Sequence, residues 1–342
     1  MAGNRFEVGH GDGPLGGYVL RDHETGSEAR VLPDVGANCV ELRVPDRSGQ
    51  PMDLMYAPES PAQLQAAPAR YGLPILFPFP NRIRDGRFTF GGTTYQLPVG
   101  RQGHAIHGLV IDRPFRVEQA EGTVDGARLR CVITPNELAT TQGYPFPFHF
   151  AADYTLQGHT LILQVTATNT GSSPMPMGFG IHPYFRTPIA PNGERARCEI
   201  AVPVRERWVL GPDLIPTGQR ETLTPAETLT DLAPLDGRTF DNVYTGVAKE
   251  GGESRCRLFD PAAGIELIVA SDAAFREIVV YAPPGLPALC FEPYTCTTDA
   301  FNLQERGVDA GRMTLEPGAR WVGTIEVSCQ LSGISPQQGS AA

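Results

Sequence analysis

Glycine and proline are spread along the whole of this chain, and they constrain its fold more than any other feature. The 342 residues include 38 glycines and 32 prolines. Inside an α-helix, proline costs about 3 kcal/mol and glycine about 1 kcal/mol relative to alanine. Turns are therefore expected every few residues, and few segments can hold a long helix. A fold of short strands joined by turns is favoured.

Two segments carry the pattern of a β-hairpin. Residues Arg87–Leu97 alternate aromatic and polar side chains on both sides of Gly91-Gly92, a pair typical of a two-residue hairpin turn. Residues Ala152–Asn169 contain two strand-like runs on either side of Gly158. Both segments are predicted to form antiparallel strand pairs.

The remaining secondary-structure patterns are short. Further strands are predicted from period-two alternation or brief apolar runs at Gly17–Arg21, Asn38–Val44, Leu129–Thr134, Ile265–Ala270, Glu277–Tyr281 and Trp321–Leu331. Helical patterns cover only Pro61–Arg70, Thr224–Leu232 and a single turn at Asn136–Thr141. Many strands with few short helices predict an all-β fold, an antiparallel sandwich or barrel.

The chain shows no sign of division into separate domains. No linker rich in Ser, Gly or charge separates two different halves, and no repeat of fixed period occurs. We predict one domain over residues 1–334. Residues 335–342 have nothing to bury and are predicted to form a disordered tail.

Charge and hydropathy exclude several classes of partner. The net charge is −10 and the pI is near 5.2, and no segment concentrates Lys and Arg, so a nucleic-acid partner is not expected. No run approaches the roughly 18 consecutive apolar residues that span a bilayer. The segment Met1–His10 lacks the charged-then-apolar pattern of a signal sequence. We expect a cytoplasmic protein with no membrane partner.

Three motifs point away from a metal or nucleotide cofactor. The seven cysteines are scattered and never spaced as CxxC, so buried free thiols are expected in place of disulfides or a cysteine-rich zinc site. His104 and His107 lack an HExxH signature, and no metal site is expected there. Gly11–Gly16 formally matches GxGxxG, but a strand pattern follows it, which indicates a turn and not a dinucleotide site.

Five segments place titratable residues among apolar or Gly/Pro-rich neighbours. They are Phe79–Ile83, His104–Leu109, Gly178–Phe185, Phe240–Tyr244 and Cys290–Tyr294. Burying Arg, His, Asp or Glu is costly unless the group is paired or used. Recurrence of the pattern predicts that the five segments meet at one site.

In these segments the chain resembles the aldose 1-epimerase (galactose mutarotase) family, from about Gly72 to Asn302. The motifs, in the family's order, are Asn-Arg-Ile at 81–83 before an aromatic hairpin, His-Gly at 107–108, His-Pro-Tyr-Phe at 182–185, Asp-Asn-Val-Tyr at 241–244, and Glu292 before Thr-Asp-Ala-Phe-Asn at 298–302. The resemblance implies a single large antiparallel β-sandwich with a sugar cleft on one face and no cofactor.

The residue types suit interconversion of the α and β anomers of an aldose. Opening a pyranose requires a base to take the proton from the C1 hydroxyl while an acid protonates the ring oxygen, and the roles reverse on closing. A carboxylate and an imidazole suffice. The resemblance assigns Glu292 as the general base and His182 as the general acid. It implies that Arg82, His107 and Asp241 hold the sugar.

Further substrate-binding candidates come from the same motifs. Asn81 precedes Arg82, and an aromatic ring suits the C–H face of a sugar. The aromatic candidates are Phe79, Tyr184, Tyr244 and Phe301, of which Tyr184 adjoins the His182 motif. A place in the sheet core remains open for each of them.

Structural roles also remain open for the titratable residues. In a structural role, His182 would be a hydrogen-bonded histidine of the core, and Glu292 would be the buried ion-pair partner of Arg82. Asp241 would cap a turn, and His104 would be a structural neighbour that supports His107.

Three other functions remain open. A hexose 6-phosphate mutarotase would need a cationic pocket, for which the candidates are Arg82, Arg84, Arg87, Arg101 and Arg113. A non-catalytic carbohydrate-binding protein would need no aligned acid/base pair. A glycoside hydrolase would need two carboxylates such as Asp241 and Glu292, which leaves the histidine motifs unexplained. The sugar and the choice between monomer and homodimer are left open.

Overall fold

Antiparallel sheets make up most of the molecule. The computed structural model describes residues 4–100, 102–134 and 143–331. The largest sheet has nine strands, in the spatial order β11 (Arg116–Gly122), β12 (Ala127–Ile133), β13 (Phe148–Gln157), β14 (Thr160–Asn169), β28 (Arg320–Leu331), β24 (Ile265–Ser271), β23 (Ser254–Asp260), β18 (Glu199–Ala201) and β21 (Ala233–Pro234). This sheet forms one layer of the fold.

Two further sheets form the opposing layer. The eight-stranded sheet contains β20 (Pro216–Thr222), β19 (Glu206–Leu210), β22 (Phe240–Thr245), β25 (Glu277–Ala282), β26 (Ala288–Tyr294), β16 (Gly180–Ile181) and β6 (Ile75–Leu76), with β17 (Tyr184–Arg186) also paired to β26. The five-stranded sheet contains β1 (Phe6–His10), β2 (Tyr18–Asp22), β3 (Ser27–Leu32), β4 (Asn38–Pro45) and β5 (Pro51–Asp53).

Short elements connect and flank these sheets. The small strand pairs are β7 (Arg82–Ile83) with β10 (Ala105–Ile106), β8 (Arg87–Phe90) with β9 (Thr93–Gln96), and β15 (Met175–Met177) with β27 (Met313–Leu315). The described helices are α1 (Pro61–Ala66) and α2 (Ala300–Glu305), with single 3₁₀ turns at Arg84–Gly86 and Arg195–Arg197.

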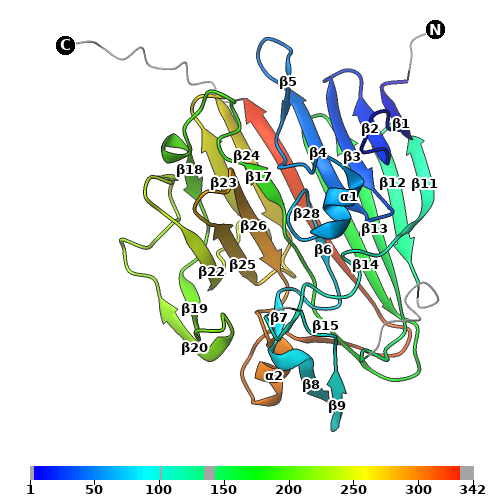
Figure 1. Cartoon of the computed structure of the whole chain (residues 1–342), viewed down its shortest axis with the longest axis vertical. Helices are drawn as coiled ribbons and strands as arrows, with labels where there is room; N and C mark the ends of the chain where they lie inside the picture. Colours follow the sequence, from blue (N-terminus) through cyan, green and yellow to red (C-terminus); the bar gives the residue numbers. More distant parts are fainter. Residues whose placement is uncertain (1–3, 101, 135–142, 332–342) are drawn as a thin grey trace.

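The layers enclose a continuous core (Figure 1). The five-stranded sheet packs on one end of the nine-stranded sheet, where β1 contacts β11 and β2 contacts β12 and β13. The eight-stranded sheet lies over the other end, in front of β23, β24 and β28 in Figure 1. One cluster of buried apolar residues includes Val31, Val165 and Phe291, which come from the three large sheets. The fold is therefore the predicted all-β antiparallel sandwich with few short helices.

Strand β26 is buried on both of its faces. Leu289 and Phe291 belong to the core between the layers, whereas Cys290 and Tyr294 pack in separate clusters. Because side chains alternate along a strand, Glu292 lies on the same face as Cys290 and Tyr294. The outer face of β26 is thus covered, and a polar residue on this strand is removed from bulk water.

The register of the neighbouring strands brings further side chains to that outer face. Val279 of β25 is paired with Glu292, and Tyr281 is paired with Cys290. Asp241 of β22 is in turn paired with Tyr281. Paired residues in adjacent strands point to the same side of a sheet. Titratable residues from separate parts of the chain therefore meet on one surface.

Most strand predictions are confirmed. The hairpin of β8 and β9 turns at Gly91-Gly92, and the hairpin of β13 and β14 pairs Gln157 with Thr160 around Gly158. The other six predicted strands correspond to β2, β4, β12, β24, β25 and β28, with ends shifted by at most about two residues. The glycine-rich segment Gly11–Gly16 is followed by β2 and not by a helix, as expected.

The helix predictions are only partly right. Helix α1 begins as predicted, with Ser60 Oγ accepting from Gln63 N at 3.2 Å, but it ends at Ala66 and not near Arg70. The predicted helix Thr224–Leu232 is wrong. A single turn forms at Thr224, and the carbonyl of Leu229 then accepts from Val202 N at 2.6 Å, which draws the chain onto the sheet. The segment Asn136–Thr141 and the tail 335–342 lie outside the described residues.

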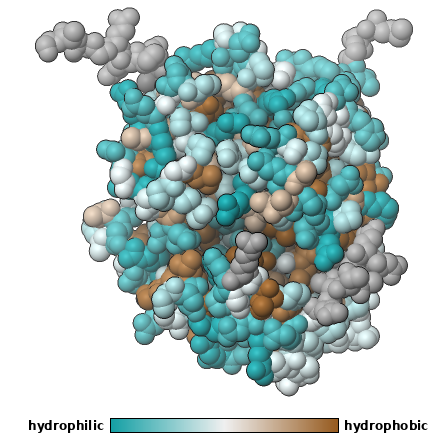
Figure 2. Space-filling model, viewed as in Figure 1, coloured by the Kyte–Doolittle hydropathy of each residue, from teal (hydrophilic) through white to brown (hydrophobic). Residues whose placement is uncertain are grey.

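The surface and the cysteines agree with the composition. All seven cysteines are free and buried. Figure 2 shows that hydrophilic residues cover most of the face drawn there and that hydrophobic residues form only small groups on it. In the described part of the chain, no helix combines the length and apolar character needed to cross a bilayer.

Phe150 tests the core between the layers. Its side chain is 0% exposed and contacts the rings of Phe77 and Phe179, at centroid distances of 4.7 Å and 6.0 Å. Phe150→Ala is expected to lower the free energy of unfolding by about 3–5 kcal/mol, because the cavity it leaves cannot fully collapse. Urea denaturation measures this change. Val124→Ala, at a residue that is 92% exposed, is the control and should stay within about 0.5 kcal/mol of the unmodified protein.

Candidate active site

A cavity of about 410 Å³ opens on the outer face of the eight-stranded sheet. Seven of the residues that the sequence analysis singled out for catalysis and substrate binding line it: Asn81, Arg82, His107, His182, Tyr184, Asp241 and Glu292. They come from segments that are as much as 211 positions apart in the chain, as Asn81 and Glu292 are. The volume is within the usual range for small-molecule sites, about 300–1,000 Å³.

Glu292 projects from β26 into this cavity and is only 1% exposed. Burial raises the pKa of its carboxyl well above the usual range, and a hydrogen bond from the Tyr294 hydroxyl opposes that shift. Tyr294 lies two residues further along the same strand, so it is on the same face. A carboxyl with a raised pKa is a stronger base once it is ionised.

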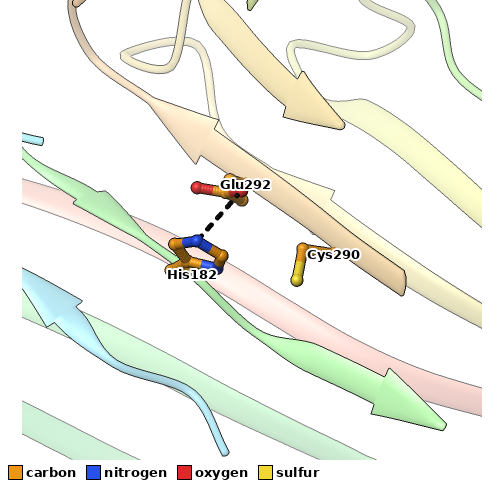
Figure 3. A group of neighbouring side chains, drawn as sticks. All are labelled: His182, Cys290 and Glu292. Carbon is orange, nitrogen blue, oxygen red and sulfur yellow. Dashed lines mark ion pairs between the residues drawn. The ribbon is translucent and has the colours of Figure 1, made fainter. Parts of the chain in front are cut away.

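His182 also lines the cavity and faces Glu292. It lies between β16 and β17, where its backbone N–H donates to the carbonyl of Pro74 at 3.0 Å. Its Nε2 lies 3.4 Å from Oε1 of Glu292, and Figure 3 shows the two side chains pointing toward each other. Burial lowers the pKa of the imidazole well below its usual value, and the neighbouring His107 adds to the shift. The two groups form a buried acid/base pair.

Asn81, Arg82 and His107 are brought together by the small pair β7 and β10. Arg82 is in register with Ile106, and His107 N donates to the carbonyl of Asn81 at 2.8 Å. Arg82 Nη1 donates to Asn81 Oδ1 at 2.9 Å, and Nη2 donates to Gln102 Oε1 at 3.1 Å. The guanidinium is therefore held at the cavity by neutral partners, and its charge is available to a ligand.

The backbone around the cavity is locally strained. Asn81, His107 and Leu214, all lining residues, have left-handed φ values of 53°, 63° and 60°. Non-glycine residues rarely adopt this conformation and keep it only where the surroundings enforce it. At the next position, Gly108 has φ 77°, and a Cβ there would lie 2.3 Å from the carbonyl oxygen of Phe77. Only glycine fits, so the His-Gly motif has a steric cause.

The electrostatics of the site centre on Arg82. Desolvation lowers the pKa of His107 to about 3, and the charge of Arg82 acts in the same direction. His107 is therefore neutral at physiological pH and able both to donate and to accept a hydrogen bond. Asp241 is open to the cavity, where partial desolvation raises the pKa of its carboxyl and Arg82 opposes the rise.

Several buried polar atoms in the site lack a protein partner. Within the described residues, Nδ1 of His107, Nδ1 of His182 and Nε of Arg82 are buried without a hydrogen bond. Buried polar groups are normally paired, so clustered exceptions need an explanation. A ligand rich in hydroxyl groups would supply the missing partners.

The four aromatic candidates have different positions. Tyr184 lines the cavity, and its ring stacks on His182 with a centroid distance of 4.7 Å. Tyr244 lies three residues after Asp241 on β22, so the two side chains point to opposite faces of the sheet. Tyr244 points into the core between the layers. Phe79 and Phe301 contact each other in the same core. The candidacy of these three residues for stacking on a sugar in this cavity is wrong.

A hexose 6-phosphate mutarotase would need a cationic pocket, and among its five candidate arginines only Arg82 is a described residue that lines this cavity. Of its candidate cations, Arg82 lines the cavity, whereas Arg84 pairs with Asp213 at 2.6 Å. Arg113 lines a different cavity, and Arg101 lies outside the described residues. Arg87 is exposed on β8 and is not among the residues that line the cavity.

One group of side chains in the described residues has the composition of a metal site. His182, Cys290 and Glu292 offer ligand atoms within 4.8 Å of one another (Figure 3). An ion held there would occupy both members of the acid/base pair, so the two uses exclude each other. Burial beside Glu292 also raises the pKa of the Cys290 thiol, and a thiol must lose its proton to bind a metal. His104 is not part of this group, and its Nδ1 accepts a hydrogen bond from Asp85 N at 3.0 Å.

Sequence reasoning missed several residues of the site. Arg70, Gln102, Leu214, Val279 and Tyr281 also line the cavity. Tyr281 could have been found from the sequence, because it lies in the predicted strand Glu277–Tyr281, where alternate side chains point to the same face. The others lie in connecting segments or in an apolar strand, and no local pattern distinguishes them.

The comparisons with known proteins identify the family of this chain and agree with its fold. The profile of the aldose 1-epimerase family matches residues 18–328. The chain therefore belongs to the aldose 1-epimerase family. It is 26% identical to the galactose mutarotase of Mus musculus over 234 residues, which cover 68% of this chain and 63% of that protein's length. It is also 26% identical to the uncharacterized protein YihR of Escherichia coli (strain K12) over 247 residues, 71% of this chain and 74% of that one.

A solved structure extends the likeness of the fold to nearly the whole chain. A galactose mutarotase-like protein from Clostridium acetobutylicum superposes with a TM-score of 0.84 at 23% identity, and the match covers 96% of this chain and 99% of that one. At this identity the likeness establishes the fold.

Gly108 tests the steric cause of the His-Gly motif. Gly108→Ala is expected to destabilise the protein through both its φ of 77° and the overlap with Phe77. Gly103 has φ 78° but no atom within 4 Å of an added Cβ, so Gly103→Ala isolates the backbone effect, about 1–2 kcal/mol. Thermal and urea unfolding should show a further loss of about 1–3 kcal/mol for Gly108→Ala. Equal losses in the two variants would refute the steric explanation.

Proposed function

We propose that this protein is an aldose 1-epimerase that interconverts the α and β anomers of a free aldose. The observation that carries the proposal is the pair of Glu292 and His182, whose facing atoms lie 3.4 Å apart at the wall of a cavity of about 410 Å³. An acid and a base at that separation fit the C1 hydroxyl and the ring oxygen of one pyranose, which are bonded to the same carbon.

Ring opening requires one proton to leave the sugar and one to enter it. The Glu292 carboxylate takes the proton from the C1 hydroxyl, and protonated His182 delivers a proton to the ring oxygen as its bond to C1 breaks. The product is the open-chain aldehyde, with Glu292 protonated and His182 neutral. Rotation about the C1–C2 bond presents the other face of the aldehyde. Closure then returns a proton from Glu292 to O1 and takes one from the C5 hydroxyl to His182.

The pKa shifts suit this exchange because the pair always holds one proton. Carboxylate with imidazolium and carboxylic acid with imidazole contain the same number of protons. Burial raises the pKa of Glu292 and lowers that of His182, which favours the neutral arrangement that accompanies the open-chain sugar. Hydroxyl groups of the closed sugar donate to the carboxylate and make the charged arrangement accessible. Neither half of the cycle then requires a proton from solvent.

The other lining residues suit a positioning role. Arg82 donates to sugar oxygens, and neutral His107 both donates and accepts. Asp241, which also lines the cavity, accepts from hydroxyl groups. Holding the ring in one orientation supplies part of the rate enhancement by itself.

A non-catalytic sugar-binding function is less well supported. Such a protein needs hydroxyl partners and an aromatic surface, but it gains nothing from two buried titratable groups in contact. The same argument disfavours a glycoside hydrolase, in which His182 would have no role.

Glu292→Gln tests the base directly. The substitution preserves the shape of the side chain but removes the basic carboxylate, so kcat/KM for mutarotation is expected to fall by about 10²–10⁴-fold. Polarimetry of freshly dissolved aldoses, corrected for the buffer-catalysed rate, measures this loss, and circular dichroism monitors the fold. Glu316→Gln, at an exposed residue, should leave the rate unchanged. Near-normal mutarotation in Glu292→Gln would refute the proposed role.

Tyr294→Phe tests the origin of the pH dependence. The Tyr294 hydroxyl lowers the pKa of Glu292 by donating to its charged form, so removing it should raise that pKa further. The alkaline limb of the kcat/KM profile, where the pair loses its shared proton, is then expected to move to higher pH. The acid limb reports a second proton on His182 and should stay below pH 6.5 in both proteins, because burial lowers that pKa. An alkaline limb that moves to lower pH would contradict the assignment.

A further inference from the structure

A second cavity adjoins the catalytic one and is lined mainly by tyrosines. It has a volume of about 290 Å³ and shares Arg70, Tyr184 and Tyr281 with the catalytic cavity. Tyr56 and Tyr71 complete its aromatic lining. We name it the tyrosine cavity. The two volumes together remain within the usual range of small-molecule sites.

The aromatic walls are held in place by the fold. The rings of Tyr56 and Tyr71 stack with a centroid distance of 5.5 Å and an interplanar angle of 23°. Tyr56 N donates to the carbonyl of Tyr184 at 2.9 Å, which ties this wall to the wall shared with the catalytic cavity. The rings of Tyr184 and Tyr281 meet edge to face at 6.5 Å. Rigid rings with hydroxyl groups at their edges suit a sugar, which has C–H faces and polar edges.

Arg70 stands at the junction of the two cavities. Its side chain has no hydrogen bond or ion pair to another described residue and lines both cavities. Burial raises the pKa of the Tyr184 and Tyr281 hydroxyls, and the charge of Arg70 opposes both shifts. Its donors are therefore near both tyrosines and available to a ligand that passes between the cavities.

The proposed chemistry determines which part of the substrate reaches the tyrosine cavity. In the proposed mechanism, Glu292 acts on the C1 hydroxyl and His182 acts on the ring oxygen. The ring oxygen is bonded to C1 and to C5, so C5 lies on the side of His182 that faces away from Glu292. Tyr184 stacks on His182 at 4.7 Å, and Tyr281 lies 5.8 Å from its ring. The cavity behind these tyrosines thus adjoins the carbon that bears C6. The C1 hydroxyl must stay free to react, so no extension is possible there.

We propose that the tyrosine cavity binds a second sugar ring that is linked through O6 of the reacting aldose, which makes reducing 6-O-linked disaccharides preferred substrates. The inference rests on the proposed function and specifies its substrate class. A charged group on C6, such as phosphate, is disfavoured because Arg70 is the only Lys or Arg among the described residues that line this cavity, and a phosphate usually engages several cationic donors.

A comparison of substrates tests the inference on the unmodified protein. Polarimetry or NMR exchange gives kcat/KM for glucose, for the 6-O-linked disaccharides gentiobiose, isomaltose and melibiose, for the 4-O-linked disaccharides maltose and cellobiose, and for glucose 6-phosphate. At least one 6-O-linked disaccharide is expected to exceed glucose by about tenfold, mainly through KM. The 4-O-linked disaccharides should show no such gain. Acceleration of glucose without a gain for any 6-O-linked disaccharide would overturn the inference alone, and no acceleration of any aldose would overturn the proposed function.

Two variants distinguish the tyrosine cavity from the catalytic one. Tyr71→Ala removes a wall that the catalytic cavity does not share, so it should abolish the roughly tenfold advantage of the disaccharide while glucose keeps its kcat/KM. Tyr71→Phe retains the stacking face and should retain the advantage. Leu286→Trp, at another residue of the tyrosine cavity, fills the space and should have the same effect as Tyr71→Ala. Thermal unfolding verifies that each variant folds.

Opposite results would reject the second sugar ring. If Tyr71→Ala and Leu286→Trp both leave the disaccharide advantage intact, the second ring lies elsewhere. If glucose 6-phosphate is the best substrate and Arg70→Gln removes its advantage, the cavity recognises an anionic group in place of a sugar.

Discussion

The contact between Glu292 and His182 is the interaction on which the rest of the site depends. Burial opposes ionisation of both groups, so either one alone would be an unfavourable buried charge. Their facing atoms lie 3.4 Å apart. In the proposed mechanism the pair holds one proton, and the charged and neutral arrangements differ only in the position of that proton. Tyr294, on the same face of β26, donates to the carboxyl and fixes its orientation. The position of the Glu292 carboxyl is therefore set by a strand that is hydrogen-bonded on both sides, whereas His182 lies in the two-residue connection between β16 and β17.

The residues around this pair are held by a different device. Asn81 and His107 sit in left-handed backbone conformations at the same end of the short pair β7 and β10. The strain at these positions is tolerated because Gly108 packs its Cα directly against the backbone of Phe77, where no side chain fits. Such a close backbone contact leaves little freedom of movement. It places the neutral His107 imidazole beside His182, with ring centroids 5.3 Å apart.

Much of the fold was predictable from local patterns, and the limits of the prediction have clear causes. The β8–β9 hairpin followed from Gly91-Gly92, because a tight turn leaves its mark within a few residues. The helix predicted at Thr224–Leu232 failed because the carbonyl of Leu229 bonds to a residue distant in sequence. Tyr244 was wrongly predicted to contact the sugar although Asp241 lines the cavity, because the two residues lie three positions apart on β22 and point to opposite faces of the sheet. Arg70 was missed because an isolated arginine before a tyrosine carries no local signal.

Under the proposed function, strands and connections hold different parts of the site. In the proposed mechanism, Glu292 and His182 act only on the atoms around C1, which every aldose shares, and these two residues sit on or beside strands β16, β17 and β26. Arg70 and Tyr71, which line the cavity proposed for the second sugar ring, belong to the connection between α1 and β6. Connections tolerate substitution better than paired strands, because their side chains pack less tightly. Changes there can alter which sugar is bound while the proton transfer at C1 is preserved.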